Sequence, residues 1–575
     1  SRGGTYALAM SAALTSSSSW WRDLNAAMAP STPPPRAKPL VDEHLRWYPK
    51  ADTALLSRAY AVAEHLHREQ KRKSGEPFII HPLAVATILA EMGLDTATLV
   101  AALLHDTVED TPFSLAHLTA EFGPEVGVMV DGVTKVDQSM YGRDAAAGET
   151  FRKMVVAARD DLRVLLIKLA DRLHNLRTLQ FQPPHKRIKI AQGTRELLIP
   201  LAERLGVYRL KRELEDLCFE YLEGEAFEHT RAQVEKTRRQ YVHEFDTLCM
   251  HLRDVLTGFR VKASVEVRPR HLYSVYSASQ RPHRGRDVSP LDTVRFLVVV
   301  RGDQQNAYLA LGAVHGRWRP IPAKFEDFIA TPRYNLYRAL HTTVYADGLG
   351  RKAQIIIRDT RAQVVSEYGI IAEIREDTGR NGRLSKGRTT DPEWLTRLLG
   401  WQEQASAEEL LRGARTELAD TITVLTEDGK ILTLPEGATP VDAAYALGTE
   451  TGDHYSAATV SGRLVSPTTP LREGATVQII TTDHPAPDLD WLDSTKTGEA
   501  RVGITSWHRR RDRERAEAQG RGRLRDLIGA DRILDGEASG AMLRVARRAG
   551  HPTLESLYIA VGEGRVEPED VADRV

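Results

Sequence analysis

The chain has 575 residues, of which 42% are hydrophobic and 27% charged, and its formal net charge is zero. This length predicts several domains, about three to five, and the apolar content allows most of them to bury a core. A zero net charge excludes a global field that recruits nucleic acid, so any polyanion site must be a local patch. With Cys218 and Cys249 as the only cysteines, a disulfide framework and a zinc finger are excluded, which fits a reducing cytoplasm.

The first 40 residues are rich in serine and proline, as in SAALTSSSSWW and APSTPPPRAKP. This composition predicts a disordered leader over residues 1–40, and without a sustained apolar run a signal peptide is not expected. No apolar stretch in the sequence reaches the roughly 18 residues that a membrane span needs. We therefore expect a cytoplasmic protein with no membrane contact.

Residues 41–200 show helical periodicity almost throughout, with little strand signal. Apolar residues recur every three or four positions in six segments, which are 56–70, 82–92, 96–104, 114–122, 148–159 and 162–179. This pattern predicts an all-helical domain of about eight helices.

Two apolar helices of this block are interrupted by residues that could carry chemistry. The run ALLHDTVEDT places His105 and Asp106 at the end of one helix, with Glu109 and Asp110 one turn later. Neighbouring helical residues point about 100° apart, so His105 and Asp106 can share one ion only at the helix edge. The run IKLADRLHNLRTL places Asp171 inside the other helix, where an aspartate needs a charged partner or a metal.

Each of these residues alone is more often structural, either salt-bridged or satisfied in a core. As a set they are hard to explain in that way. The upstream run RKSGEPFIIHP adds Arg72, Lys73, Ser74 and His81. The set offers two imidazoles and two carboxylates to a divalent metal, a second carboxylate pair to a water, and basic groups to a phosphorylated substrate. This combination favours metal-assisted hydrolysis of a phosphate ester.

These three runs resemble the HD-type hydrolase domain of the RelA/SpoT homologues, the synthetase/hydrolases of the alarmone (p)ppGpp. The match extends through residues 55–200. The resemblance implies one metal, usually manganese in this family, held by His81, His105, Asp106 and Asp171. It implies that the attacking water is positioned and deprotonated by Glu109 and Asp110. It implies nucleotide contacts from Arg72, Lys73, Ser74, Asn175 and Thr178. Mixed histidine and aspartate ligation suits manganese or another first-row divalent ion.

Residues 201–375 change from helical to strand patterns. Helices are predicted over 203–224 and 229–259. The strands predicted after them are ASVEVRP, TVRFLVVV, TTVYAD and AQIIIRD, with a helix at AYLALGAVHGRW. RPRHLYSVY, HGRWRPIPAKFEDFIATPRYNLYRALHTTV and SEYGIIAE resemble the (p)ppGpp synthetase domain of the same family. We therefore expect an α+β, nucleotidyltransferase-like domain.

Four positions of this domain depart from the family pattern. Pro290 stands where the family has a metal-binding aspartate, and Asp292 is displaced from that place by about 7 Å along a strand. Gln354 replaces the catalytic glutamate and Ala278 replaces a lysine. The family's His-Trp pair is replaced by Glu373–Ile374. Because pyrophosphoryl transfer from ATP needs magnesium, and magnesium needs carboxylates, we expect that synthesis is lost.

The guanine side of the same domain keeps Asn335, Tyr337 and His341. Two interpretations are open. The three residues could form a retained nucleotide-sensing pocket, or they could serve the fold alone, since tyrosine and histidine also pack well.

Residues 376–420 begin with the polar, glycine-rich run REDTGRNGRLSKGRTTDP, which predicts a linker, followed by a helix over 392–418. The next segment predicts a hairpin turned at Asp428-Gly429, a helix and two more strands. Residues 421–481 resemble a TGS domain, a β-grasp module that meets the end of a deacylated tRNA on the ribosome in the long family members. Asp453 stands where the family has a histidine.

Residues 482–575 are predicted to be helical and contain the basic run WHRRRDRERAEAQGRGRLRD. This run is either a solvated helix with i to i+4 charge pairs or an RNA-contacting face. The segment resembles the helical domain that follows TGS in the long members, which continue into a zinc-finger-like and an ACT domain. We therefore expect a truncated C-terminus, with contact to the ribosome or tRNA through the TGS domain and the basic helix.

Three functions are compatible with these patterns. The first is removal of the 3′-pyrophosphate of (p)ppGpp, giving GDP or GTP plus pyrophosphate, without synthesis. The second is hydrolysis of another nucleotide, such as NADPH, by the same HD chemistry. The third is a non-catalytic regulator that binds nucleotide or the ribosome. The complete metal set and the broken synthetase set favour the first.

Overall fold

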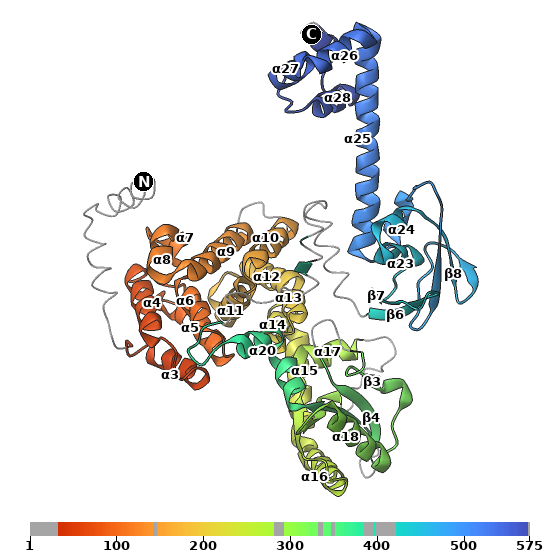
Figure 1. The fold of residues 1–575 in the computed structure, drawn as a ribbon. Coiled ribbons are helices and arrows are strands. Elements are labelled where there is room, and N and C mark those ends of the chain that lie inside the picture. Colours follow the sequence, from red (N-terminus) through yellow and green to blue (C-terminus); the bar gives the residue numbers. More distant parts are fainter. Residues whose placement is uncertain are drawn as a thin grey trace. The chain divides into compact units, whose positions relative to one another are not determined.

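The chain divides into two units, Ser1–Leu395 and Thr396–Val575, which are taken separately below (Figure 1). The leader predicted over residues 1–40 and the helix predicted over 392–418 lie mostly outside the residues that the structure describes. In this computed structural model the described residues are 33–141, 147–280, 292–331, 337–346, 351–384, 395, 396, 399 and 421–572.

The first part of unit 1 is a helical bundle, as the sequence predicts, and is coloured red to orange in Figure 1. Its helices are α3 (Lys38–Trp47), α4 (Thr53–Leu66), α5 (Ile80–Glu91), α6 (Thr96–Leu104), α7 (Thr107–Asp110), α8 (Leu115–Phe122), α9 (Pro124–Tyr141), α10 (Ala147–Asp160) and α11 (Arg163–Arg177). Every residue of α6 except Ala97 is buried, and the helix packs against α4, α5 and α9. Helix α6, which ends directly before His105, and helix α11, which carries Asp171, therefore lie in the core.

The sequence patterns do not predict α9, because Gly127 and Gly132 are poor helix formers within it. The structure gives a reason for the second glycine. A Cβ atom at Gly132 would lie 2.7 Å from a methyl group of Val164. The glycine thus allows α9 to pack closely on α11.

Helices join this bundle to a sheet. They are η1 (Leu179–Phe181), α12 (Pro184–Gly193), η2 (Thr194–Leu198), α13 (Ile199–Arg204), α14 (Tyr208–Leu222), α15 (Gly224–Gln240) and α16 (Val242–Gly258). The two helices predicted over 203–224 and 229–259 are wrong in their limits. The chain breaks at Gly206, whose φ is 68°, and again at Tyr241. Packing of α14 on α11 brings the second block against the bundle.

The α+β domain predicted from the strand patterns is confirmed. Its elements are β1 (Ala263–Pro269), α17 (Leu272–Ser279), β2 (Val294–Val300), α18 (Gln304–Arg317), η4 (Pro322–Lys324), β3 (Glu326–Asp327), β4 (Leu340–Ala346), β5 (Arg351–Asp359), α19 (Thr360–Tyr368) and α20 (Ile370–Asp377). The strand order is β1-β2-β5-β4-β3, with β2 and β5 parallel and the other neighbours antiparallel. Helices α16 and α18 share one hydrophobic core with this sheet.

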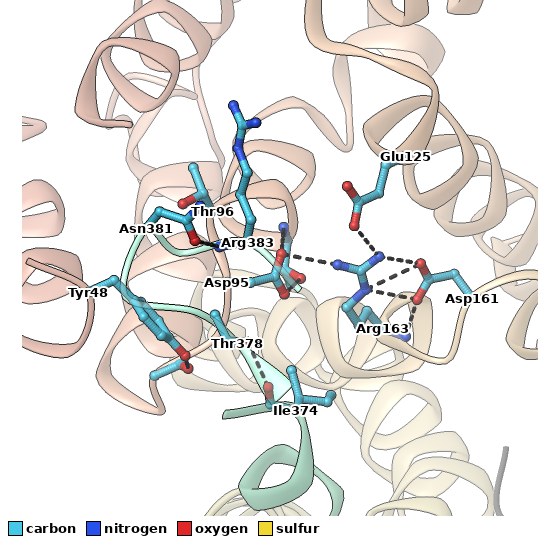
Figure 2. A network of polar contacts seen from close by, with 12 residues as sticks. Tyr48, Asp95, Thr96, Glu125, Asp161, Arg163, Ile374, Thr378, Asn381 and Arg383 are labelled. Carbon is cyan, nitrogen blue, oxygen red and sulfur yellow. Dashed lines mark hydrogen bonds and ion pairs between the residues drawn. The ribbon is translucent and has the colours of Figure 1, made fainter. Parts of the chain in front are cut away.

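After α20 the chain returns to the helical bundle. Arg375 stacks over the ring of Trp47, with 3.9 Å between the guanidinium carbon and the ring centroid. The backbone N–H of Thr96 donates to the carbonyl oxygen of Gly382 at 2.9 Å. We call residues 375–384 the strap, because they cross the amino end of α6 (Figure 2).

Unit 2 begins with a five-stranded sheet of order β7-β6-β10-β8-β9, in which β6 and β10 are parallel. Its elements are β6 (Thr421–Thr426), β7 (Ile431–Pro435), α23 (Pro440–Leu447), α24 (Thr449–Asp453), β8 (Tyr455–Val460), β9 (Arg463–Val465) and β10 (Thr476–Thr481). The hairpin predicted at Asp428-Gly429 is confirmed, and Gly429 has a φ of 83°. Two further strands were predicted and three are present, because β9 is too short to give a periodic signal.

The rest of unit 2 is helical, as predicted. The helices are η5 (Leu489–Asp493), α25 (Gly498–Ile528), α26 (Ala530–Ala538), α27 (Ala541–Arg548), α28 (Leu554–Gly562) and α29 (Pro568–Ala572). The long helix α25 contacts both α23 of the sheet domain and α28. Across the part of the chain that the structure describes, none of the helices combines the length and apolar character needed to cross a membrane.

Candidate active site

Helix α6 positions His105, and hydrogen bonds fix both ends of this helix. At the start, the Asp95 carboxylate accepts hydrogen bonds from the N–H and the hydroxyl of Thr98, at 3.1 and 2.6 Å. At the end, His105 Nδ1 donates to the carbonyl oxygen of Ala102 at 2.8 Å. Because a carbonyl only accepts, Nδ1 carries a hydrogen, and Nε2 faces Asp106.

Two histidine nitrogens and one carboxylate converge beside this helix end. His105 Nε2 lies 3.1 Å from Asp106 Oδ1, and His81 Nε2 lies 3.5 Å from Asp106 Oδ2. One ligand atom from each of these three residues lies within 4.8 Å of the other two. Two imidazole nitrogens with a carboxylate oxygen suit a first-row divalent ion such as manganese, so the donor set fits the predicted metal.

Asp171 reaches this group from α11, through His81. Its Oδ1 atom lies 3.2 Å from His81 Nε2, although Asp171 is not part of the 4.8 Å group. Lys168 donates to its Oδ2 atom and Asn175 to its Oδ1 atom, both at 2.6 Å. Burial opposes ionisation of Asp171, but the Lys168 ammonium and His81 hold its pKa well below the ordinary value. Asp171 is therefore a carboxylate, as a metal ligand requires.

The buried histidines beside it are neutral. Burial lowers the pKa of His81 to about 3, even though Asp171 acts in the opposite direction. Burial, helped by the positive charge of Arg72, lowers the pKa of His174 to about 4. At neutral pH both rings therefore keep a free lone pair on one nitrogen.

The predicted nucleotide-binding residues fall into two groups. Arg72 donates to the Asn175 side chain at 2.9 Å, and Asn175 in turn bonds to Asp171. Thr178 ends the same helix, and its hydroxyl donates to the carbonyl oxygen of His174 at 3.1 Å. The structure thus links Arg72 and Asn175 to Asp171, while Thr178 caps the helix that carries both Asp171 and Asn175.

Lys73 and Ser74 belong to the other group. They lie in a tight loop that turns at Gly75, whose φ is 89°. Lys73 donates to the side chain of Gln182 at 2.7 Å, and Ser74 donates to Glu76 at 3.0 Å. Their contact with a nucleotide stays a prediction.

The two predicted proton acceptors follow the metal group directly. Glu109 and Asp110 lie in the short helix α7, and their side chains are exposed. The backbone N–H of Asp110 donates to the carbonyl oxygen of Asp106 at 2.9 Å. The carboxylates are therefore one turn from the candidate metal ligand and open to solvent, where a water can reach them.

Two residues that contact the candidate ligands, Lys168 and His174, were not predicted from the sequence. Both lie three positions from Asp171, which puts them on the same face of α11. Their signal was a charged and a polar residue at that spacing in a largely apolar helix.

Arg163 was not predicted either, and its side chain is fully buried at the start of α11 (Figure 2). Arg163 donates to Asp95 at 3.0 Å, to Asp161 at 2.6 Å and to Glu125 at 2.8 Å. Asp95 is also the cap of α6. One buried network therefore joins the amino ends of the two helices whose later residues form the site.

The second block contains a cavity of about 520 Å³. At its wall Arg295 donates to the side-chain oxygen of Gln354 at 3.2 Å, so a neutral amide occupies the place predicted for a carboxylate. Three further arginines gather around one acid. The guanidinium groups of Arg212, Arg268 and Arg358 all pair with Glu367.

The guanine-side residues line the same cavity where the structure describes them. The Tyr337 hydroxyl lies 2.7 Å from His341 Nε2. Ala278 is also part of the wall. Pro290 and Asn335 lie outside the described residues.

In unit 2, Asp453 and the arginines of the basic run form side-chain contacts within the unit. Asp453, at the position where the family has histidine, accepts a hydrogen bond from the Tyr445 hydroxyl at 2.9 Å and lies 3.7 Å from Arg510. Charge pairs within one helix were one of the two interpretations of the basic run. In the structure Arg513 pairs with Glu555 of α28 at 3.1 Å, and Arg521 pairs with Glu537 of α26 at 2.8 Å. These arginines therefore also hold the helices of unit 2 together.

A helical bundle with a His–His–Asp group, joined to a mixed sheet and followed by a second sheet and further helices, defines a multidomain protein of the HD class. The family described as HD domain matches residues 59–208, and the TGS domain family matches residues 422–481. Two more specific families also match. They are the region found in RelA/SpoT proteins, over residues 267–379, and the RelA/SpoT AH domain, over residues 507–575.

Named bacterial proteins are similar to this chain over most of its length. It is 42% identical over 563 residues to a Mycobacterium tuberculosis protein named bifunctional (p)ppGpp synthase/hydrolase RelA, covering 95% of this chain and 75% of that one. It is 41% identical over 563 residues to a Mycobacterium leprae protein named probable GTP pyrophosphokinase, covering 95% and 70%. It is 36% identical over 520 residues to an Aquifex aeolicus protein named guanosine-3′,5′-bis(diphosphate) 3′-pyrophosphohydrolase, covering 89% and 72%. The chain belongs to the RelA/SpoT family of enzymes.

Proposed function

We propose that this protein is a metal-dependent (p)ppGpp 3′-pyrophosphohydrolase that has lost synthetase activity. It would convert guanosine tetra- or pentaphosphate to GDP or GTP plus pyrophosphate, in the cytoplasm. The observation that carries the proposal is the convergence of His81, His105 and Asp106 within 4.8 Å in the HD domain. The name of the Aquifex aeolicus relative supports this choice of substrate.

The residues divide the work of hydrolysis between them. His81, His105, Asp106 and Asp171 would hold the metal, which when bound lowers the pKa of a water and screens phosphate charge. Glu109 and Asp110 orient the attacking water and take its proton. The water oxygen bonds to the phosphorus next to the ribose, the bond from this phosphorus to the 3′ oxygen breaks, and that oxygen gains a proton. Arg72 and Lys73 bring positive charge to the phosphates.

The loss of synthesis is supported by the chemistry of the second cavity. Gln354 cannot bind magnesium as a carboxylate would, and it is bonded to Arg295. Because some relatives are named as synthases, this part of the proposal needs its own assay.

The substrate is tested with a panel of nucleotides that includes ppGpp, pppGpp and NADPH, each with manganese and again with EDTA. We expect release of pyrophosphate from the first two only, abolished by EDTA. Glu109→Gln and Asp110→Asn should each slow turnover about 10²–10⁴-fold while manganese still binds. Turnover of NADPH alone would establish the alternative HD specificity. If no nucleotide is turned over, and the protein co-sediments with ribosomes to the same extent with and without His105→Ala, the protein would be a non-catalytic regulator.

The TGS and AH matches also suggest a ribosome or tRNA partner for unit 2. Asp453 is turned toward Tyr445 and Arg510, so it would not replace the missing histidine in an RNA contact. We propose that any such contact uses the basic side chains of α25. Co-sedimentation with ribosomes that weakens steeply with salt would support it, because phosphate contacts release counterions.

A further inference from the structure

The two histidines of the metal group are oriented by different kinds of partner. His105 Nδ1 faces a backbone carbonyl, which can only accept a hydrogen bond. His81 Nδ1 lies 2.9 Å from Nδ1 of His174, a ring nitrogen that can either donate or accept. Both rings of the pair are buried, with exposed fractions of 3% for His81 and 9% for His174.

The position of the hydrogen decides what His81 can do. A neutral imidazole carries one hydrogen, so only one of its nitrogens has a lone pair for a metal. His81 Nε2 faces the metal side, 3.5 Å from Asp106 and 3.2 Å from Asp171. If Nε2 carries the hydrogen, it donates to Asp171 and is lost as a ligand. If Nδ1 carries it, Nε2 is free, and Nδ1 needs an acceptor.

The geometry of α11 places His174 against His81 Nδ1 and away from the metal side of the ring. Asp171 and His174 are one turn apart on the helix, and the His81 ring lies between them. Asp171 contacts its Nε2 atom and His174 its Nδ1 atom. The two rings are 5.0 Å apart, centroid to centroid. His174 thus lies behind His81, on the side away from the metal group.

We propose that His174 is a positioning residue that accepts the Nδ1 hydrogen of His81 and so presents His81 Nε2 to the metal. The inference rests on the metal site of the proposed function. His174 lies in the run IKLADRLHNLRTL, but it is not among the residues predicted to bind the metal or the nucleotide. Partners of this kind typically change metal affinity 10–100-fold when they are removed.

The test compares two substitutions in the full chain. His174→Asn keeps an acceptor oxygen near the place of Nδ1, whereas His174→Leu removes it and keeps the side chain apolar. His44→Leu is the control, because His44 is another buried histidine of the same bundle, bonded to Thr96 at the opposite end of α6. Manganese binding is measured by electron paramagnetic resonance titration of metal-free protein, and the unfolding temperature is measured without metal.

We expect His174→Leu to weaken manganese binding 10–100-fold, and His174→Asn and His44→Leu to remain within about threefold of wild type. The metal-free unfolding temperatures of the two His174 variants should agree. Wild-type affinity in a folded His174→Leu protein would overturn the inference and leave the proposed function standing. Equal weakening by leucine and asparagine would overturn it as well. No manganese binding by wild type would overturn both.

Discussion

At the scale of single residues, the pair Lys168–Asp171 determines how the site tolerates mutation. Both side chains are buried, and the ammonium lies 2.6 Å from the carboxylate. Asp171→Ala should abolish manganese binding, and it also breaks the buried ion pair between Lys168 and Asp171, which costs about 3–5 kcal/mol. The expected result in urea unfolding is therefore a destabilised protein.

A double variant separates the two effects. Lys168→Met together with Asp171→Leu removes both charges, so most of the lost stability should return while manganese binding stays absent. If the double variant were as unstable as Asp171→Ala, the buried ion pair would not be the cause.

His44 gives a prediction for the pH dependence of stability. Burial lowers its pKa from 6.5 to about 4, although Asp95 acts in the opposite direction. Between these two pH values the unfolded chain binds more protons than the native one, so the unfolding free energy falls as pH falls from 6.5 to 4. His44→Gln should reduce this slope by up to about 1.4 kcal/mol per pH unit. Denaturant unfolding of metal-free protein between pH 7 and pH 5 measures it, and an unchanged slope would contradict it.

The sequence predicts the site residues better than the contacts among them. Helical spacing alone brings Asp171 and Asn175 to one face, and the short run His105–Asp106 to one helix end. It cannot show that His81 meets His174, because that contact joins residues 93 positions apart. Lys168 was not predicted for a related reason. A lysine in a helix is ordinarily exposed to solvent, and the sequence does not show that this one is buried.

At the scale of elements, the crossing of α25 and α28 depends on two glycines. A Cβ atom at Gly520 would lie 1.8 Å from the carbonyl oxygen of Tyr558, and one at Gly562 would lie 1.9 Å from that of Ala516. Gly520→Ala should force the helices apart and destabilise unit 2 by about 1–3 kcal/mol. A Cβ at Gly522 meets nothing within 4 Å, so Gly522→Ala should be neutral or stabilising by up to about 1 kcal/mol. Thermal unfolding that ranks the two variants alike would contradict this packing.

Element types follow the sequence patterns where the apolar period is unbroken, as in α6, and in β2 with its continuous apolar run. The predictions fail where a local feature competes with the apolar period. Gly132 makes α9 hard to recognise in the sequence, although this glycine is needed for the packing of α9 on α11. Gly206 ends a helix whose stripe continues on either side of it. A single sequence records the glycine but not which of these two roles it has.

At the scale of the whole molecule, the strap connects the α+β domain to the helical bundle of unit 1. Arg375 stacks on Trp47, and the Gly382 carbonyl accepts the N–H of Thr96 at the start of α6. Arg375→Ala should loosen the strap, because a stacked arginine is worth about 0.5–2 kcal/mol. Hydrogen exchange at the Thr96 amide should then become faster.

The control for that variant is another arginine of the same block. Arg361 forms an exposed ion pair with Glu376 at 3.0 Å, and exposed pairs contribute little. Arg361→Ala should therefore leave exchange at Thr96 unchanged. Equal exchange in both variants would show that the strap does not hold α6. If the strap does hold it, the helices of the HD domain depend on the α+β domain for their stability.

The central claim is a hydrolase without a synthetase, and one preparation of the full chain tests it. Loss of ppGpp is followed with manganese, with and without EDTA, while formation of ppGpp from ATP plus GDP with magnesium is followed in parallel. We predict manganese-dependent hydrolysis that EDTA abolishes, and no synthesis. Synthesis at a rate comparable to hydrolysis, or no hydrolysis by protein that binds manganese, would contradict the account.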